Sequence, residues 1–428
     1  MSTLAAPADR RTTRRITFYV ALAVFAQEAT WDFYDSQVPP LLREHIASTA
    51  VVGLLMGMDN LLGIFVQPWI ANRSDNTRTR WGRRIPYLAV GMPVAAVLFT
   101  LIPLATALPA LIAVIFVYAL AGNTFKPIAQ ALLPDFIPPD RRGRANAFVK
   151  IASGLTVLVS ALISAFLVDD HPALSFAVPS ALMLVCTAVL VWRVRDSESR
   201  GYRAALTEDR GAAEPETRLR DVLRDVVRDH DRSRLLVVCT VLLFACAWFS
   251  SRALFTPYGM ETLGLTRGEA GSLTFPSGIA FLLAAYPAAL LAERIGRIRT
   301  ITIGMSVFGV SLALGALAPT PATTVAAFCV GAVGAAGFVI NAAVVLWNLA
   351  PSSRVTGVYT TLYTVSWAVG GFAGPGLVGA MIDVTGWRYL LLDVALLCAL
   401  AVAVVLRVAV LTRRHATSLQ ETPKGHRS

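Results

Sequence analysis

The sequence carries little charge for its length. Charged residues make up 15% of the 428 positions, against about 25% in ordinary soluble domains, and hydrophobic residues make up 55%. The mean hydropathy is +0.61. These values exclude a soluble globular protein, so the net charge of +11 does not indicate binding to nucleic acid. The apolar runs are continuous and do not alternate with polar residues, which excludes a membrane β-barrel.

The motifs of ATP-driven and hydrolytic chemistry are also missing. The sequence contains no GxxxxGK[ST] phosphate loop, no HExxH and no GxSxG, and its five histidines are scattered. We therefore expect no enzyme activity, no metal and no cofactor. Cysteine is scarce, and all five cysteines fall within apolar runs, so we expect them to pack in the core without forming disulfides.

Twelve apolar runs are long enough to form membrane helices of about 20 residues. They lie at about residues 16–38, 50–71, 86–106, 109–133, 146–168, 173–193, 235–257, 271–291, 300–319, 322–348, 357–381 and 388–410. The sequence therefore predicts an all-α membrane protein with twelve transmembrane helices. Of the 38 lysines and arginines, 33 fall at the two ends or in alternate loops. Because positive residues stay cytoplasmic, we expect both termini on the cytoplasmic side of the plasma membrane.

A short charged stretch after the second span recurs after the eighth. The first copy, ANRSDNTRTRWGRR, runs from Ala71 to Arg84, and the second, ERIGRIR, runs from Glu293 to Arg299. Each charge placed in the centre of the hydrocarbon would cost roughly 2.5–3.5 kcal/mol, so both stretches are interfacial loops. Their recurrence predicts two related halves of six helices each.

These loops resemble the loop signature of the major facilitator superfamily. The longer copy, with its SD and RWGRRIP elements, is similar to the sucrose-transporter and glycoside–cation symporter branches. The resemblance is best over residues 59–86, and it implies the major facilitator fold and transport by alternating access. The loop residues that we expect to form a gate are Asp75, Arg80, Gly82, Arg83, Arg84, Asp135, Arg144, Glu293, Gly296 and Arg297.

The predicted organisation has four parts. Residues 1–193 form the first six-helix half and residues 235–411 form the second. Between them, residues 194–234 form a cytoplasmic linker whose segment 217–234 has apolar residues at helical spacing, which predicts an amphipathic helix on the membrane surface. Residues 412–428 form a cytoplasmic tail.

The first span carries three carboxylates, Glu28, Asp32 and Asp35, at positions i, i+4 and i+7. This spacing places them on one helical face. Ionisable groups at membrane depth are expensive and mark functional sites, although Asp35 could simply mark the outer end of the helix. Trp31 and Tyr34 lie among them, which suits either a sugar site or an interfacial aromatic belt.

The second span adds another buried acid, Asp59. In the sodium-coupled glycoside symporters that this region resembles, an acid precedes the proline ahead of the charged loop. Here Gln67 precedes Pro68, which argues against that sodium site and leaves the proton as the expected coupling ion.

The fourth span contains Lys126, whose ammonium needs a partner inside the membrane. In the superfamily that the loops resemble, spans 1 and 4 both line the cavity, so Glu28 is an expected partner; snorkelling to the cytoplasmic surface is the alternative. Asn123 and Gln130 give this helix a polar face that we expect to bind substrate.

The second half offers a less charged set of candidate residues. Arg252 lies in the outer third of span 7, where it contacts either substrate or the outer surface. Asn341 in span 10 and Tyr363 and Trp367 in span 11 combine an amide with aromatic rings, as a neutral polyol site requires. Asp393 in span 12 has no predicted role.

The sequence thus predicts a secondary active transporter, expected to be monomeric in the lipid bilayer, that moves a sugar or glycoside by proton-coupled symport. A proton on Glu28 or Asp32 would change the pairing of that face with Lys126. Two alternatives remain open at this stage: a proton-driven exporter of drugs or metabolites, and a membrane sensor or scaffold that transports nothing.

Overall fold

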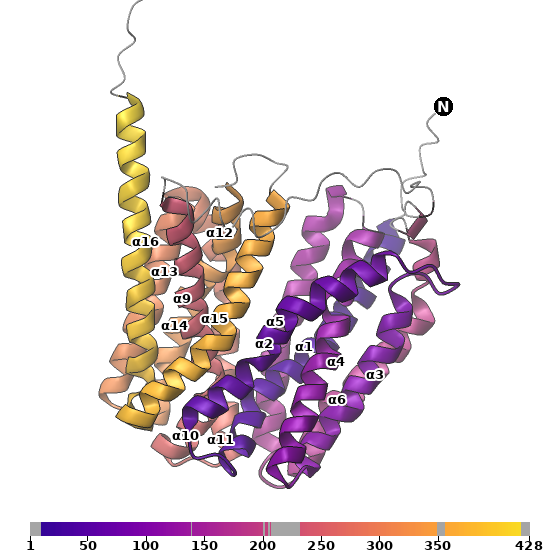
Figure 1. Cartoon of the computed structure of the whole chain (residues 1–428), viewed down its shortest axis with the longest axis horizontal. Helices are drawn as coiled ribbons and strands as arrows, with labels where there is room; N and C mark the ends of the chain where they lie inside the picture. Colours follow the sequence, from indigo (N-terminus) through magenta and orange to yellow (C-terminus); the bar gives the residue numbers. More distant parts are fainter. Residues whose placement is uncertain are drawn as a thin grey trace, which may run out of the picture. The chain divides into compact units, whose positions relative to one another are not determined.

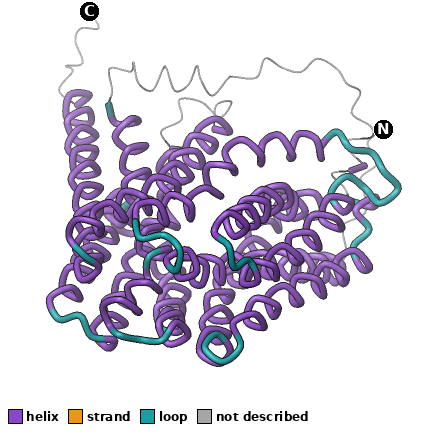
Figure 2. The backbone as a smooth tube through the Cα atoms, turned by 60° about the horizontal axis from the view of Figure 1, so that its bottom comes forward, coloured by secondary structure: helices purple, strands orange, loops and turns teal. Residues whose placement is uncertain are grey.

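The computed structural model describes residues 10–137, 139–199, 202–203, 206, 232–348 and 356–420 of the chain. The described residues are almost all helical and include one isolated β-bridge, between Thr79 and Gly82 (Figures 1 and 2). The helices in the first part of the chain are α1 (Arg10–Arg43), α2 (Thr49–Asp75), α3 (Ile85–Leu101), η1 (Ile102–Leu104), α4 (Leu108–Phe136), α5 (Pro139–Leu167), α6 (Pro172–Arg193) and η2 (Asp196–Glu198). Those in the second part are α9 (Ser233–Ala253), α10 (Phe255–Leu263), α11 (Arg267–Ser272), α12 (Thr274–Ile295), α13 (Arg297–Leu317), α14 (Pro321–Asn348), α15 (Thr356–Thr385), η4 (Trp387–Tyr389) and α16 (Leu390–Gln420).

Ten of these helical segments are long and apolar enough to cross a membrane. The other two predicted spans are α1 and α5. The first has 34 residues but carries three carboxylates, and the second has a shorter apolar part at Ile151–Leu167. The prediction of a twelve-helix, all-α membrane protein is confirmed. The predicted amphipathic helix at 217–234 lies almost entirely outside the described residues.

Two predicted spans are interrupted where proline follows. Helix α9 ends at Ala253, four residues before Pro257, and α11 ends at Ser272, four residues before Pro276. Proline has no N–H to donate, and its ring clashes with the carbonyl four residues earlier, so each helix breaks at that position. The seventh span therefore continues as a separate helix, α10, and the eighth begins with the short helix α11.

The chain separates into two compact units. Unit 1 comprises Met1–Ala47, Met58–Ala213 and Phe255–Gly278. In this unit α1 packs against α4, α5 and α6, α3 packs between α4 and α6, and α11 packs against α5. Its core is aromatic: the Phe99 ring lies 5.1 Å, centroid to centroid, from both Tyr118 and Phe176.

Unit 2 comprises Ser48–Gly57, Glu214–Leu254 and Ile279–Ser428. Here α9 packs against α15 and α16, and α13 packs against α14 and α16. Phe244 anchors the core, with its ring 4.1 Å from Phe338 and 5.5 Å from Phe308. Each unit takes in a segment from the other predicted half: unit 1 includes α10 and α11, and unit 2 includes the start of α2. The predicted boundaries between halves, linker and tail stay a prediction.

Candidate functional site

The acidic face of α1 lies well inside the helix. Glu28, Asp32 and Asp35 are all half-buried, and α1 continues to Arg43, so Asp35 does not mark its end. The hydroxyl of Thr156 on α5 donates a hydrogen bond to Asp32. The three carboxylates therefore share a face as predicted, but Asp32 is directed towards α5.

Asp59 on α2 belongs to a second group of charges within unit 1. The side-chain amide of Asn60 donates to its Oδ1 atom over 2.9 Å. Asp35 and Lys126 are close enough to Asp59 for their charges to act on it. The structure thus brings together two of the predicted coupling residues, Asp59 and Lys126, and adds Asp35, which was not among them.

Lys126 contacts an aromatic ring. Its Nζ atom lies 5.6 Å from the centroid of Trp31, within the range of a cation–π interaction. Trp31 is only 7% exposed, and Lys126 is half-buried. Glu28, the expected partner, lies one turn before Trp31 on the same helix.

Trp31 and Tyr34 form a ring cluster with Tyr118 of α4. The centroids are 5.5 Å apart for Trp31 and Tyr34, 5.2 Å for Trp31 and Tyr118, and 5.6 Å for Tyr34 and Tyr118. Such stacking fixes the rings and leaves their polar atoms available. A binding surface of this kind suits a solute with both apolar faces and hydroxyls.

Three buried side chains on α1 have polar atoms without hydrogen-bond partners among the described residues. They are the Gln27 amide, the Trp31 indole N–H and the Tyr34 hydroxyl. An unsatisfied buried polar atom costs about 1–3 kcal/mol, so such groups usually serve water or a ligand. Gln27 was not predicted, although its spacing to Trp31 and Tyr34, i, i+4 and i+7, was visible in the sequence. We call Gln27, Trp31 and Tyr34 the polar stripe of α1.

The predicted amides on α4 differ in their surroundings. Asn123 is buried and donates to the backbone oxygen of Asp59 over 3.0 Å, while Gln67 donates to Asn123 over 2.7 Å. Asn123 therefore joins α4 to α2. Gln67, the residue before Pro68, takes part in the same link. Gln130 is exposed.

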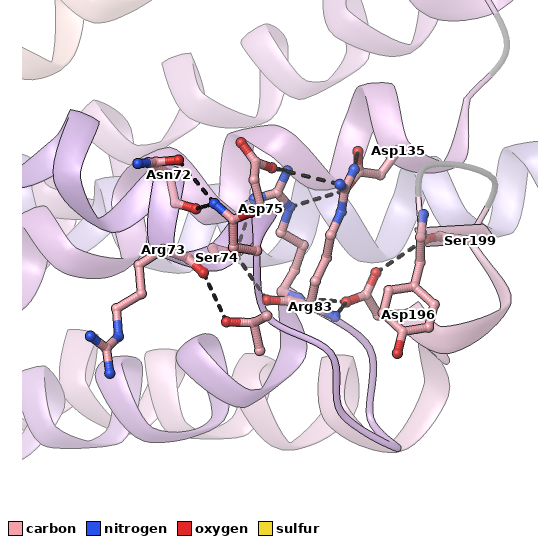
Figure 3. Close-up of polar contacts among 12 residues, drawn as sticks. Asn72, Arg73, Ser74, Asp75, Arg83, Asp135, Asp196 and Ser199 are labelled. Atoms are coloured by element: carbon pink, nitrogen blue, oxygen red, sulfur yellow. Dashed lines mark hydrogen bonds and ion pairs between the residues drawn. The ribbon is translucent and has the colours of Figure 1, made fainter. Parts of the chain in front are cut away.

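The loop after α2 is fixed by a network of ion pairs (Figure 3). Arg83 and Arg84 both reach Asp135 at the end of α4, at 2.6 and 2.9 Å, and Arg84 also pairs with Asp75 at 2.5 Å. Arg84 and Asp135 are largely buried, so the charges are desolvated and depend on each other. Asp135 thus pairs with this loop, and the gating role of the pair stays a prediction.

Asp196 of η2 completes the network and was missed, because it lies in the predicted linker. It is fully buried and accepts hydrogen bonds from the backbone N–H groups of Arg83 and Arg84, at 2.6 and 2.5 Å. Gly82, with φ of +97°, allows this approach, since a Cβ there would lie 2.3 Å from the Asp196 carboxylate. The available signal in the sequence was a glycine in a charged turn, because a left-handed glycine can leave the following backbone N–H groups free to bind a carboxylate.

The second copy of the loop keeps the turn and loses the ion pairs. Gly296 has φ of +93°, close to that of Gly82. In the part of the chain that the structure describes, neither Glu293 nor Arg297 forms an ion pair, and Glu293 is exposed. Arg80 is also exposed, and the side chain of Arg144 lies outside the described residues.

Among the candidate residues of unit 2, Trp367 and Tyr363 lie in one group of rings. The Trp367 ring stacks on Tyr363 and on Phe338, with both centroid distances 6.2 Å. Arg252 lies over a neighbouring ring, Trp248, at 5.8 Å. Asn341 is buried and donates to the backbone oxygen of Gly337 in its own helix over 3.0 Å.

Asp393, which had no predicted role, lies in the first turn of α16. It accepts a hydrogen bond from the Thr385 hydroxyl at 3.1 Å. A carboxylate in the first turn is stabilised by the helix dipole, so a structural role accounts for it.

Comparison with known proteins decides the family. The sequence model of the Major Facilitator Superfamily matches residues 20–266 and 237–428, which together span nearly the whole chain. The chain belongs to the major facilitator superfamily. It is a transport protein of the membrane and not an enzyme.

Curated relatives match this major facilitator protein over limited stretches. The sucrose transport protein SUT4 of Oryza sativa subsp. indica is 27% identical over 163 residues, covering 33% of this chain and 27% of the rice protein. The membrane-associated transporter protein of Homo sapiens is 30% identical over 79 residues, covering 18% of this chain and 15% of the human protein. The matches thus span about a quarter or less of these relatives.

Solved structures match over the full length and show the fold. A bacterial homologue of the human lysosomal transporter Spinster, in an inward-facing and unoccupied conformation, has a TM-score of 0.75 at 14% identity, covering 94% of this chain and 98% of the other. The nucleoside transporter NupG has a TM-score of 0.74 at 12% identity, covering 92% and 99%. At such identities the similarity confirms the major facilitator fold and leaves the solute open.

Proposed function

We propose that this protein is a proton-coupled symporter of a small polar solute, a sugar or glycoside. The observation that carries the proposal is the polar stripe of α1, whose buried amide, indole and hydroxyl groups have no partner among the described residues. These groups are uncharged and lie beside stacked rings, as recognition of a neutral polyol requires. The stretch similar to a protein named for sucrose transport supports the same solute class.

We assign binding of the coupling proton to the charged groups beside this stripe. Asp59 lies near both Asp35 and Lys126, and the Lys126 ammonium in turn lies over Trp31 of the stripe. Protonation of one carboxylate would change the net charge around Lys126 and hence the position of the ring it covers. Glu28 and Asp32, half-buried on the same helix, remain candidates for carrying the proton. Gln67 is bound to Asn123 and offers no carboxylate for sodium.

The topology that goes with this function is also a proposal. We place both termini and the loops of Gly82 and Gly296 in the cytoplasm, because 33 of the 38 lysines and arginines lie at the ends or in the alternate set of loops to which these two belong. The Arg83–Asp135 network would then brace the cytoplasmic gate. The protein would act as a monomer in the plasma membrane.

A direct test uses purified protein in liposomes that contain a pH-sensitive dye. Pools of sugars, nucleosides and amphipathic cations are added outside in turn, and the internal pH is followed. We expect one sugar pool to drive protons inward, and Glu28→Gln and Asp59→Asn to be silent. Asp170→Asn, an exposed acid in the loop after α5, is the matched control and should transport normally. Sugar uptake that a protonophore does not change would contradict coupling.

A second candidate function is proton-driven export of drugs or metabolites. It is favoured by the ring cluster around Trp367 in unit 2, which suits a larger apolar compound. In the same assay, proton movement driven by the amphipathic cations and by no sugar would favour the exporter. A protein with no flux of any solute would point to the sensor or scaffold.

A further inference from the structure

Two aspartates occupy equivalent places in the two predicted halves. Asp169 follows α5, the fifth span, and Asp383 lies in the last turn of α15, the eleventh span. Both therefore lie in the set of helix ends opposite the Gly82 and Gly296 loops. Each accepts hydrogen bonds from the start of a helix that belongs to the other half of the sequence.

Asp383 caps the start of α2 within unit 2. Its carboxylate accepts hydrogen bonds from the Ser48 hydroxyl at 2.8 Å and from the backbone N–H groups of Thr49 and Ala50 at 2.7 and 3.1 Å. The first N–H groups of a helix have no partner inside it, and they carry the positive end of the helix dipole. A carboxylate satisfies both requirements, yet this one comes from a residue more than 300 positions away.

The helices α2 and α15 are also in direct backbone contact next to this cap. A Cβ on Gly53 would lie 2.1 Å from the backbone oxygen of Pro375. No side chain fits there without moving the two helices apart. The hydrogen bonds of Asp383 therefore stabilise an interface at which the backbones of α2 and α15 are in contact.

Asp169 makes the corresponding contact within unit 1. It accepts hydrogen bonds from the Thr266 hydroxyl at 2.7 Å and from the Gly268 N–H at 2.8 Å, at the start of the eighth span. Arg267, between them, donates to the side-chain and backbone oxygens of Gln37 on α1, at 2.8 and 2.6 Å. The eighth span is thus tied at its first residues to both α5 and α1.

Helix capping alone does not require the contact of Asp169. The start of α11 already has its own capping box, in which Thr266 and Glu269 satisfy each other's backbone N–H groups. A second acceptor from the other half adds little to that helix but joins the two halves. The arrangement is reciprocal: an acid of the first half binds the second, and an acid of the second half binds the first.

We propose that Asp169 and Asp383 are paired latches, which hold the halves together at this end and must both release before the site opens there. The inference rests on alternating access, which is part of the proposed function. Weakening either latch destabilises the closed arrangement and leaves the open one unchanged, so the open population rises. Replacing a latch carboxylate with an amide removes its charge and one of its two acceptor oxygens, which should raise the open population roughly two- to tenfold.

The test measures the distance between α2 and α15 without any solute. Spin labels are placed at Val51→Cys and Val384→Cys, both exposed, in a background without the five native cysteines, and the protein is reconstituted in nanodiscs for double electron–electron resonance. We expect a longer distance to appear or grow in Asp383→Asn and also in Asp169→Asn, although the hydrogen bonds of Asp169 in the described structure go to Thr266 and Gly268. Asp170→Asn removes the same charge beside the first latch and should match the parent.

Three further results would decide the matter. If neither variant changes the distance distribution, the paired-latch proposal is wrong. If only Asp383→Asn changes it, the proposal is also wrong, and Asp383 acts only as a local helix cap. If Asp383→Asn does not fold, Ser48→Ala removes one donor and keeps the carboxylate, and it should give a smaller shift in the same direction. Because no solute is used, opening in the variants would support the latches even if the proton assay found no symport.

Discussion

In unit 1 the candidate site residues include a lysine and several carboxylates, whereas in unit 2 Arg252 is the single charged candidate and the others are an amide and the rings of Tyr363 and Trp367. Lys126 and two carboxylates, Asp35 and Asp59, lie in unit 1. Phe338 and Tyr363 stack on Trp367 in unit 2. The charged loops differ in the same sense: the copy in unit 1 is bound by buried ion pairs, and the copy in unit 2 keeps only the glycine turn.

This difference separates what stability requires from what transport requires. Stacked rings stabilise a fold by themselves, and they would be retained without any function. Charged groups at membrane depth are costly, so their presence needs another explanation, which in transporters is ion or substrate movement. We therefore expect substitutions in unit 1 to separate transport from stability more clearly than substitutions in unit 2.

The largest expected effect compares the two loops. Arg84→Gln leaves the buried carboxylate of Asp135 with Arg83 as its remaining arginine, and the loss of one charged hydrogen-bond partner costs about 1.5–3 kcal/mol. Arg297→Gln, at the start of α13 in the second loop, removes an arginine with no ion pair among the described residues and should cost less than about 0.5 kcal/mol. Thermal unfolding in detergent, followed by tryptophan fluorescence, measures both. Equal losses in the two variants would show that the loops are held in the same way.

The loops also show how much of the structure could be predicted from the sequence. The recurrence of an acid, a glycine and arginines was enough to predict the interfacial position and the twofold repeat. It did not predict Asp196, because a carboxylate that binds backbone N–H groups needs no partner side chain and leaves no charge pattern. The membrane spans were predictable because hydrophobicity is a local property of the sequence. The breaks before Pro257 and Pro276 also have a local cause, the prolines themselves, which the prediction of continuous spans did not include.

Side-chain neighbours in the site were less predictable. The common face of Glu28, Asp32 and Asp35 follows from helix geometry alone, but which of them approaches Asp59 depends on the rotation of α1 against α2, α4 and α5. That rotation is set by packing, for example of Trp31 against Tyr118. The sequence consequently favoured Asp32, which contacts Thr156, over Asp35.

The second comparison sets an acid of unit 1 against an acid of unit 2. Asp59→Asn should reduce solute-driven proton movement at least about tenfold while the protein stays folded, because the coupled charge is lost. Asp393→Asn should keep transport, since that carboxylate bonds Thr385 at a helix start. Internal pH in dye-loaded liposomes reports both. Loss of proton movement in Asp393→Asn alone would place the coupling in unit 2.

A smaller effect is expected from the buried amides. Gln27→Ala should weaken binding of the transported solute by roughly two- to tenfold, because its amide is free of protein partners in the described structure. Asn341→Ala should have less effect on affinity, since the Asn341 amide already donates to Gly337. Isothermal titration in detergent measures the affinities. An unchanged affinity in Gln27→Ala with a loss in Asn341→Ala would reverse the assignment.

The smallest expected effect concerns a hydroxyl in the ring cluster of unit 2. Tyr363→Phe keeps the ring that stacks on Trp367, so affinity should change by no more than about twofold if unit 2 supplies only an apolar surface. Tyr34→Phe is the matched change in unit 1, and it removes a buried hydroxyl of the polar stripe, so a larger loss is expected there. Both variants lose one oxygen from a tyrosine, and the pair therefore isolates the hydrogen bond from the ring. A greater loss in Tyr363→Phe would mean that unit 2 recognises the hydroxyls of the solute, and the division into a polar and an apolar side would fail.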